Sequence, residues 1–510
     1  MNRNRTSLGL AAAFAIMATC RIMLIFFGRL EAGLVADDTY YYFTIAKNLA
    51  AGNGPTFDGL APTNGFHPLW QLYMVPFFIN AGDLWSPVRT ILASTIILDG
   101  ISGLLVHRIV GRFAGGGYAL TAAALWWLTP FGFFLGMQGM EASLSTLLVL
   151  GALERGCAAN ASLRSAAGVG VVLGLGGLAR TDNLLSVSLA MAVLVFATKS
   201  LWPSIESRLR WLGVAAALAL AVMAPWFIWS WRQFGSVVQV SARVKLYSED
   251  VYGALHTSWG SVSESTETIV FALFPAAATA VRALTGDEFR EPTWSILITA
   301  VILLSAVPLL IWSLRRTLAK RTELRAPILF VLTYMLLHTA LFGLIGRTYA
   351  TWYALPFFGL TTVLVGWLAP AWRRATGTGL IFVRAGVVLW LAALLAIYPL
   401  YALRFPHGDQ RPDDRFAPHF ERVQELLPAG AVVGAWDAGV AGYVATDYET
   451  ITVTNLDCLV NNVAFEAVRG GRYRQYLLQT VDLYLQDQAR ARMFLDAREV
   501  QLLKDGDAGP

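Results

Sequence analysis

Apolar segments of about the length of a membrane-spanning helix recur along the chain of 510 residues. A helix needs about 20 residues to cross roughly 30 Å of hydrocarbon, so the pattern predicts about eleven spans, or at most about thirteen. The expected spans are Leu8–Phe27, Thr90–Ile109, Tyr118–Leu135, Ser143–Ala158, Ser165–Leu178, Leu184–Ala197, Trp211–Trp229, Trp294–Ser313, Ala326–Ile345, Tyr353–Ala369 and Leu380–Leu403. The first segment has no clear small-residue cleavage site, so we expect a retained span rather than a signal peptide.

Lys and Arg in the short loops indicate the orientation, because these residues concentrate on the cytoplasmic side. With about eleven spans, the loops that carry most of them fall on one side, together with Arg3 and Arg5. We therefore expect a cytoplasmic N-terminus and an extracytoplasmic C-terminus. The shorter apolar stretches His67–Asn80 and Thr268–Val281 must then lie in the interface or re-enter the membrane.

The composition agrees with a polytopic membrane protein. Hydrophobic residues make up 56% of the chain and charged residues 14%, whereas an ordinary soluble domain carries roughly 25% charge. The net charge of +5 fits cytoplasmic loops better than nucleic acid, because no basic run alternates with exposed aromatic residues. The three cysteines, Cys20, Cys157 and Cys458, indicate neither a disulfide framework nor a CxxC metal site.

After Leu403 the chain becomes charged and soluble in character. The elements expected there are strands at Ala431–Trp436 and Thr450–Thr454 and helices around His419–Leu427 and Tyr473–Gln486. We predict an all-α polytopic membrane part, residues 1–403, and a small extracytoplasmic α/β domain, residues 404–510. Residues 29–89 are expected to form the first outer loop, with interfacial helices.

That loop contains the least ordinary stretch of the chain, VADDTYYYFTIAKNLAAGNGPTFDGLAPTNGFHPLW at positions 35–70. Asp37 and Asp38 precede an amphipathic helix expected over Thr39–Ala50. Consecutive helical side chains point about 100° apart, so one acid can face a cavity while the other caps the helix or binds a second partner. A capping Asp beside a solvated neighbour is the structural alternative. Because acids where a span meets water are typical of functional sites, we favour a functional pair.

Other polar residues at span ends fall on the same predicted outer side, which indicates one shared cavity. His67 precedes Pro68 and could hold a phosphate, or be a surface histidine before a helix. Glu141, Arg180 and Asp182 could shape a pocket, or neutralise one another as a structural group.

Positive residues also occur on this outer side, where they are under-represented in membrane proteins. Arg243 and Lys245 follow one span, and the run from Arg347 to Tyr353 connects two others. They favour a local anion such as a lipid phosphate, with headgroup contact without catalysis as the alternative. In the C-terminal domain the side chains that could hydrogen-bond a sugar, or serve only as turn and strand-end residues, are Asp437, Asn455, Asp457, Asn461 and Asn462.

Taken together, these motifs resemble the GT-C superfamily, integral-membrane glycosyltransferases that use polyprenyl-phosphate sugars. The run ADDTYYYFTIAKNLAAGNGPTFDG is similar to the first outer loop of the actinobacterial arabinofuranosyltransferases. His67-Pro68 is more similar to the corresponding element of lipid-A aminoarabinose transferases. The layout covers most of the chain, but the only specific motif runs from Asp37 to Trp70.

The resemblance implies a GT-C-like fold and transfer of a sugar to an extracytoplasmic glycan, glycolipid or protein. In such enzymes a carboxylate acts as general base on the acceptor hydroxyl and cations steady the departing lipid phosphate, most simply with inversion. It implies Asp37 as the base and Asp38 as a sugar or metal contact, with the reverse assignment left open. The implied phosphate ligands are His67, Lys245 and Arg347. The implied pocket residues are Tyr41, Asn64, Glu141, Arg180, Asp182, Trp352 and Tyr353.

The resemblance further implies a bacterial plasma-membrane protein, with membrane lipids as neighbours. It leaves open a divalent cation, Mg²⁺, Mn²⁺ or Ca²⁺, at Asp38. Two Asp without another clear ligand provide few of the oxygen ligands that such a cation needs. A transporter or flippase of a lipid-linked sugar is the main alternative, although transporters tend to show internal repeats and mid-membrane polar groups. Hydrolysis of the lipid-linked sugar is a further alternative, because it is the same reaction with water as the acceptor. The sequence does not identify the sugar or the acceptor.

Overall fold

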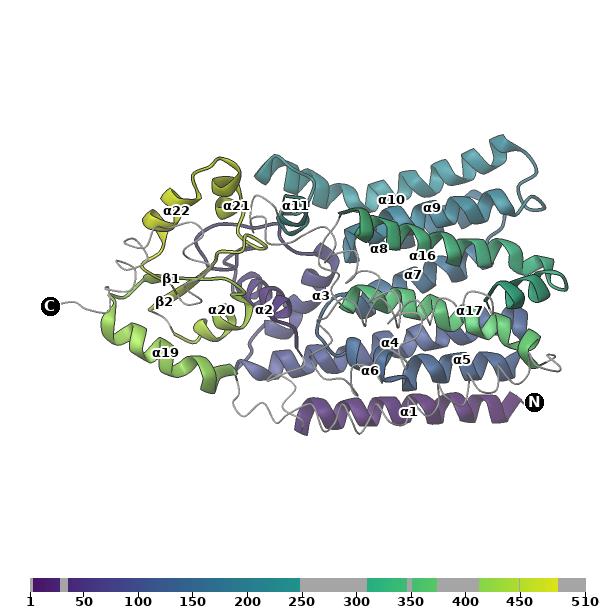
Figure 1. Cartoon of the computed structure of the whole chain (residues 1–510), viewed down its shortest axis with the longest axis horizontal. Coiled ribbons are helices and arrows are strands. Elements are labelled where there is room, and N and C mark those ends of the chain that lie inside the picture. Colours follow the sequence, from purple (N-terminus) through teal and green to yellow (C-terminus); the bar gives the residue numbers. More distant parts are fainter. Residues whose placement is uncertain are drawn as a thin grey trace, which may run out of the picture.

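The computed structural model describes residues 3–27, 35–247, 310–345, 351–373, 412–448 and 450–484. They form a bundle of helices with a small sheet at one end, opposite the N-terminus (Figure 1). The helices of the bundle are α1 (Arg3–Phe27), α4 (Trp85–Ala114), α5 (Gly116–Leu128), α6 (Pro130–Leu135), α7 (Ala142–Cys157), α8 (Leu163–Ala179), α9 (Thr181–Ala197), α10 (Ile205–Phe234), α16 (Arg325–Ile345) and α17 (Leu355–Arg373).

Several of these helices suit a membrane. In the described part of the chain, five stretches are long and apolar enough to cross one: Thr6–Phe27, Trp85–Ala114, Ile205–Phe234, Thr322–Leu341 and Trp352–Arg373. The helices α8 and α9 are also apolar but shorter, at 17 residues each. The predicted class, a helical multi-pass membrane protein with a small C-terminal α/β part, is confirmed. The expected segments Thr268–Val281 and Leu380–Leu403 lie outside the described residues, as does Trp294–Ser313 except for 310–313.

One expected span, Tyr118–Leu135, is broken in two. Helix α5 ends at Leu128, Thr129 is extended with ψ 138°, and α6 begins at Pro130. Proline lacks an N–H and disfavours the helical conformation in the residue before it, so the break falls where the sequence places Pro130. The single-helix prediction for this segment was wrong.

Two helices precede α4 and lie between the bundle and the sheet (Figure 1). These are α2 (Asp37–Ala50), which begins with the acidic pair, and α3 (Pro68–Phe78), which begins directly after His67. At 11 residues α3 extends about 16 Å, too short to cross the hydrocarbon layer. We call residues 35–84 the first loop.

The C-terminal elements form a parallel sheet with helices around it. They are α19 (Pro412–Leu426), β1 (Ala431–Ala435), α20 (Gly439–Ala445), β2 (Ile451–Asn455), α21 (Asn462–Arg469), α22 (Tyr473–Thr480) and β3 (Leu483–Tyr484). The strand order is β2-β1-β3, and Ala431 of β1 pairs with Ile451 of β2. The two predicted strands are present, but the predicted helix Tyr473–Gln486 was wrong over 481–484, because α22 ends at Thr480 and the chain then adds β3. We call residues 412–484 the sheet region.

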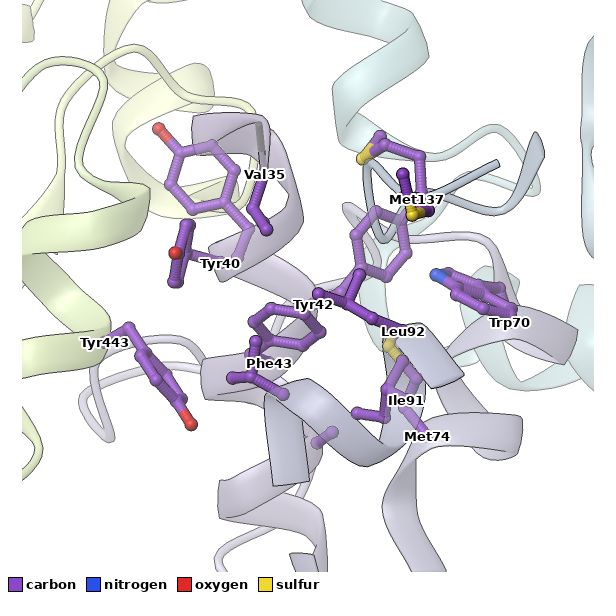
Figure 2. Packing of buried hydrophobic residues seen from close by; sticks show 14 of the residues in the cluster. Val35, Tyr40, Tyr42, Phe43, Trp70, Met74, Ile91, Leu92, Met137 and Tyr443 are labelled. Carbon is purple, nitrogen blue, oxygen red and sulfur yellow. The ribbon is translucent and has the colours of Figure 1, made fainter. Parts of the chain in front are cut away.

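The first loop and the sheet region share one hydrophobic core. Tyr443 of α20 lies with its ring centre 5.5 Å from that of Tyr40 and 5.8 Å from that of Phe43, both in α2 (Figure 2). Its hydroxyl donates a hydrogen bond to the carbonyl oxygen of Leu84, at the start of α4. Aromatic pairs of this kind contribute about 0.5–1.5 kcal/mol each beyond the area they bury. The sheet region is therefore packed against the end of the bundle rather than tethered to it.

Two glycines of α20 permit this close packing. A Cβ atom at Gly439 would overlap the backbone oxygen of Asp37, and one at Gly442 would overlap the ring of Phe57. The first contact is with backbone, and the second is with a ring that is buried and packed against Tyr41, so neither can easily move away. Both positions therefore require glycine for a steric reason rather than for backbone flexibility.

We predict that Gly439→Ala destabilises the protein by about 1–3 kcal/mol, the usual cost of overpacking. Thermal unfolding and limited proteolysis of the sheet region in detergent would measure this. The control is Gly213→Ala in α10, where an added Cβ meets nothing within 4 Å. Equal melting temperatures for the two variants would contradict the steric requirement at 439.

Candidate active site

The two acids at the start of α2 have different surroundings. The carboxylate of Asp37 accepts hydrogen bonds from the backbone N–H groups of Gly439, at 3.0 Å, and Val440, at 2.9 Å. These are the first residues of α20, whose N–H groups have no partner within the helix. Burial raises the pKa of Asp37 from 3.8 to about 7, although both backbone hydrogen bonds oppose the shift. Asp37 thus joins the first loop to the sheet region.

Asp38 leaves the same helix about 100° further round and meets a different environment. It is half-buried, and within the described ranges its carboxylate forms no hydrogen bond and no ion pair. The charged groups that act on it are Lys245, Asp437 and Glu141. Burial raises the pKa of Asp38, and the Lys245 ammonium offsets only part of that rise. Of the two acids, Asp38 is the one with oxygens available to a substrate.

Lys245 supplies a positive charge beside Asp38. It belongs to α11 (Val240–Leu246), which lies beside α21 of the sheet region (Figure 1). Its ammonium donates a hydrogen bond to the Tyr353 hydroxyl and lies 4.9 Å from the centre of that ring. Burial lowers the pKa of Lys245, but Tyr353 and Asp38 raise it by more, so the amine stays charged. No carboxylate of the described chain lies within salt-bridge distance of this ammonium.

Arg180 is held by acids instead. It lies between α8 and α9, and its guanidinium pairs with Glu141 at 2.6 Å and with Asp182 at 2.8 Å. The same guanidinium lies 3.8 Å from the centre of the Tyr353 ring. The structural alternative raised by the sequence, mutual neutralisation, therefore describes these three ionisable groups. Together they hold the Tyr353 ring in place, and the hydroxyl of Tyr353 accepts the hydrogen bond of the Lys245 ammonium.

His67 is also engaged on both ring nitrogens. Its Nε2 lies 3.8 Å from Glu141, and its Nδ1 lies 3.2 Å from the side-chain nitrogen of Gln239. That same Gln239 nitrogen donates to the carbonyl oxygen of Phe66 at 2.6 Å. Burial lowers the pKa of His67, so the ring is neutral near pH 7. It is less suited than Lys245 to hold a phosphate.

Two expected pocket residues lie in buried hydrogen-bond networks. The Tyr41 hydroxyl donates to Asp457 at 2.8 Å and accepts from the backbone N–H of Ala438 at 2.9 Å. The Asn64 amide donates to Ser230 at 2.8 Å and accepts from Asn462 at 3.0 Å. Tyr41 is 3% exposed and Asn64 1% exposed, so neither lines an open surface. They bind the first loop to the sheet region and to α10.

The polar residues of the sheet region divide in a similar way. Asn455 and Asp457 contact Tyr41, Asn461 caps α21, and Asn462 contacts Asn64. Strand-end and capping roles therefore account for these four. Asp437 differs, because it is exposed, has a positive φ of 47° directly after β1, and acts electrostatically on Asp38. It belongs to the edge of the parallel sheet, the carboxyl end, at which ligands usually bind.

Several polar atoms in this neighbourhood lack a partner in the part of the chain that the structure describes. They are Oε2 of Glu141, Oε1 of Gln138, Oε1 of Gln71 and the indole nitrogen of Trp352. Buried polar atoms without partners are uncommon in native proteins, and a bound substrate often explains them. Arg347, the remaining predicted phosphate ligand, lies outside the described residues. The described residues also contain no group of three His, Cys, Asp or Glu side chains placed to hold a metal ion.

The sequence analysis missed a buried ion pair inside the bundle. Arg21 of α1 and Asp99 of α4 lie 2.5 Å apart and are 2% and 1% exposed. Arg21 also donates to the carbonyl oxygen of Gly132 in α6 at 2.9 Å, and the indole nitrogens of Trp126 and Trp127 donate to the carbonyl oxygen of Asp99. One Arg and one Asp within otherwise apolar spans were the available signal.

This pair holds the segment that leads to the site. A Cβ atom at Gly136, just after α6, would overlap the Asp99 carboxylate. Further on, the carbonyl oxygen of Gln138 accepts from the Thr39 hydroxyl at 2.8 Å, and that of Gly139 accepts from the Trp70 indole at 3.2 Å. Glu141 follows directly. The buried pair, α6 and the acidic pair's own helix thus fix the position of Glu141.

No family model matches the chain, and no curated protein matches it. Among solved structures it is similar to ArnT from Cupriavidus metallidurans bound to undecaprenyl phosphate, with 14% identity, a TM-score of 0.53, and coverage of 92% of this chain and 89% of that one. The apo state of that ArnT gives a TM-score of 0.51 at 14% identity and the same coverage. The apo oligosaccharyltransferase from Archaeoglobus fulgidus gives a TM-score of 0.51 at 13% identity, covering 87% of this chain and 64% of that one.

At these identities the likeness concerns the fold. The chain has the GT-C fold, and the fold implied by the first-loop motif is confirmed. The chain spans less than two thirds of the length of the archaeal oligosaccharyltransferase, but nearly the whole length of ArnT.

We predict that Arg21→Met lowers the free energy of unfolding by about 3–5 kcal/mol, because it leaves Asp99 as an unpaired buried charge. The double variant Arg21→Met/Asp99→Leu should recover most of that loss. Unfolding in detergent compares them with Arg108→Gln in α4, whose side chain is 68% exposed and whose pair with Glu154 should contribute less than about 1 kcal/mol. If the double variant is no more stable than Arg21→Met, the pair is not a coupled unit.

We predict that Asp37 makes stability fall as pH rises. Its pKa is about 7 in the folded protein and 3.8 ordinarily, so between these values the folded state binds more protons than the unfolded state. Stability contributed by this group is present below pH 4 and is lost as pH approaches 7. Melting temperatures at pH 5 and pH 8 should differ less for Asp37→Asn than for wild type. An unchanged difference would contradict the assignment.

Proposed function

We propose that this chain is a membrane glycosyltransferase that moves a sugar from a polyprenyl-phosphate donor to an acceptor hydroxyl. The observation that carries the proposal is Asp38, a half-buried carboxylate without a protein partner in the described ranges, next to the charged amine of Lys245. Support comes from the fold, which is similar to that of an ArnT bound to undecaprenyl phosphate.

In this proposal the general base is Asp38 and not Asp37, the residue that the family resemblance implied. Both oxygens of Asp37 already accept backbone N–H groups of α20, so it is poorly placed to take a proton from a substrate. Burial raises the pKa of Asp38, which makes it a stronger base than an ordinary aspartate.

The chemistry is a single displacement. Asp38 removes the proton of the acceptor hydroxyl, and the acceptor oxygen forms a bond to the anomeric carbon. The bond between that carbon and the phosphate oxygen breaks, and the electron pair leaves with the lipid phosphate. Lys245 stabilises the negative charge that develops there, an effect that is strong where water is excluded. Attack from the face opposite the phosphate gives inversion.

The remaining residues position the reactants. Glu141 and Asp182 hold Arg180, which holds the Tyr353 ring, and the Tyr353 hydroxyl receives the Lys245 ammonium. The unpartnered atoms of Gln138, Glu141 and Trp352 are available to the hydroxyl groups of a sugar.

The acceptor is proposed to enter between the first loop and the sheet region. Asp437 faces Asp38 from the sheet region and is exposed, so it can bind a hydroxyl or an amine of the acceptor. A cell-envelope glycan, a glycolipid or a protein would all present such groups. In the expected orientation this entrance lies on the extracytoplasmic face of a bacterial plasma membrane.

The test is transfer from a panel of polyprenyl-phosphate sugars in liposomes, with membrane extract as acceptor. We predict that Asp38→Asn lowers kcat by roughly 10² to 10⁴ while its melting temperature stays near wild type. Asp37→Asn should change stability more than kcat, and Lys245→Met should lower kcat through loss of charge at the departing phosphate.

Two results would contradict the proposal. Asp38→Asn with wild-type kcat would remove the assigned base. Folded wild type that consumes no donor, while sealed vesicles move the lipid-linked sugar across the membrane, would favour a flippase instead. Activity with and without EDTA would test a divalent cation at Asp38.

A further inference from the structure

A small basic cavity lies at the opposite end of the bundle from the sheet region. It is formed by the helical segment 310–318, the turn after it and the last turns of α17. The residues that line it are Arg316, Thr317, Lys320, Arg321, Trp367 and Pro370. Pro370 lies roughly 22 Å along the axis of α17 from Leu355, which adjoins the candidate active site. The last turns of α17 lie at the end of the bundle away from the sheet (Figure 1), so the cavity is distinct from that site.

No acidic side chain among the described residues pairs with the positive charges around this cavity. The side chains of Arg316, Lys320 and Arg321 form no hydrogen bond and no ion pair in the ranges that the structure describes. The guanidinium of Arg316 lies 5.2 Å from the centre of the Trp312 ring. Three cations around one cavity repel each other unless an anion lies among them.

An unpartnered hydroxyl also lines the cavity. Thr317 is 5% exposed, and its Oγ1 has no hydrogen-bond partner among the described residues. A buried hydroxyl without a partner is unfavourable, and an anion oxygen in the cavity would accept its hydrogen bond. This observation is independent of the charges and selects the same position.

The surroundings place the cavity at the level of lipid headgroups. Trp312 and Trp372 are half-buried at the ends of apolar helices, and the Trp372 indole donates to the Ser313 hydroxyl at 2.7 Å. Tryptophan at the ends of membrane helices concentrates at the headgroup level. Basic pockets between helices at this level on the cytoplasmic side bind anionic lipid headgroups.

We propose that this cavity binds the phosphate of an anionic phospholipid headgroup, with Arg316, Lys320 and Arg321 as charge partners and Thr317 as hydrogen-bond donor. Positive residues in cytoplasmic loops are common and by themselves indicate only orientation. What distinguishes this group is the enclosed hydroxyl. Arg155, Arg164 and Arg210 at the same end of the bundle are exposed, as Arg316 and Lys320 are, but they do not line this cavity. The proposal does not depend on the transferase activity.

The experiment is native mass spectrometry of the purified full chain titrated with dioleoyl-phosphatidylglycerol or dioleoyl-phosphatidylcholine. Wild type should retain phosphatidylglycerol in preference to phosphatidylcholine. The variant Arg316→Gln/Lys320→Gln/Arg321→Gln should bind phosphatidylglycerol at least tenfold more weakly. The control Arg155→Gln/Arg164→Gln/Arg210→Gln removes the same charge and should stay within about twofold of wild type, since these residues contact no cavity.

The variant Thr317→Val distinguishes a specific lipid site from general attraction between anionic lipid and positive charges. It removes the hydroxyl but keeps all charges and nearly the same side-chain volume. It should weaken phosphatidylglycerol binding roughly tenfold, the usual effect of losing a hydrogen bond to a charged group. Equal losses in the site and control triple variants, or unchanged binding in Thr317→Val, would overturn the proposal. Displacement of the lipid by millimolar inorganic phosphate would also overturn it, because the site would then hold a free anion.

Discussion

The contact between the first loop and the sheet region is the constraint on which the candidate site depends. Helix α20 begins in a buried junction, where its first N–H groups need acceptors that water cannot supply. The Asp37 carboxylate and the Tyr41 hydroxyl provide them, at residues 438 to 440. Because glycine at 439 allows the backbones to touch, α2 is held at a fixed position and angle. Without this contact Asp38 would project into open solvent.

The two acids therefore have different contacts, because consecutive side chains of a helix point about 100° apart. Asp37 binds the N–H groups of α20 and so joins the first loop to the sheet region, whereas the half-buried carboxylate of Asp38 has no partner in the described ranges. The two cations also differ in whether the protein pairs them. Arg180 is occupied by Glu141 and Asp182 and supports Tyr353, which leaves Lys245 as the charge available near Asp38 in the described chain. In the proposed function, Asp38 and Lys245 act on the substrate and the other polar residues hold them in place.

The framework extends into the bundle through the buried pair of Arg21 and Asp99. Ion pairs buried in a low-dielectric medium are costly unless their remaining polar atoms are satisfied. Here that condition is met only in part. The Gly132 carbonyl oxygen accepts from Arg21, just where Pro130 has ended one helix and begun the next, but Nε of Arg21 and Oδ1 of Asp99 have no partner among the described residues. The helix break and the ion pair therefore fix one another, and together they set the path of the chain toward Glu141.

The sequence by itself determined the helical membrane class and the short strands at 431 and 451, because the period of the hydrophobic residues reports which positions are buried. It also singled out the acidic pair as a candidate. Its motifs also indicated the GT-C fold, which the similarity to solved structures confirms. It did not determine which acid is free, since that depends on N–H groups some 400 positions away in α20. Nor did it separate buried networks, as at Tyr41 and Asn64, from open surface. Those assignments require knowing which distant segments meet, and only the tertiary structure decided them.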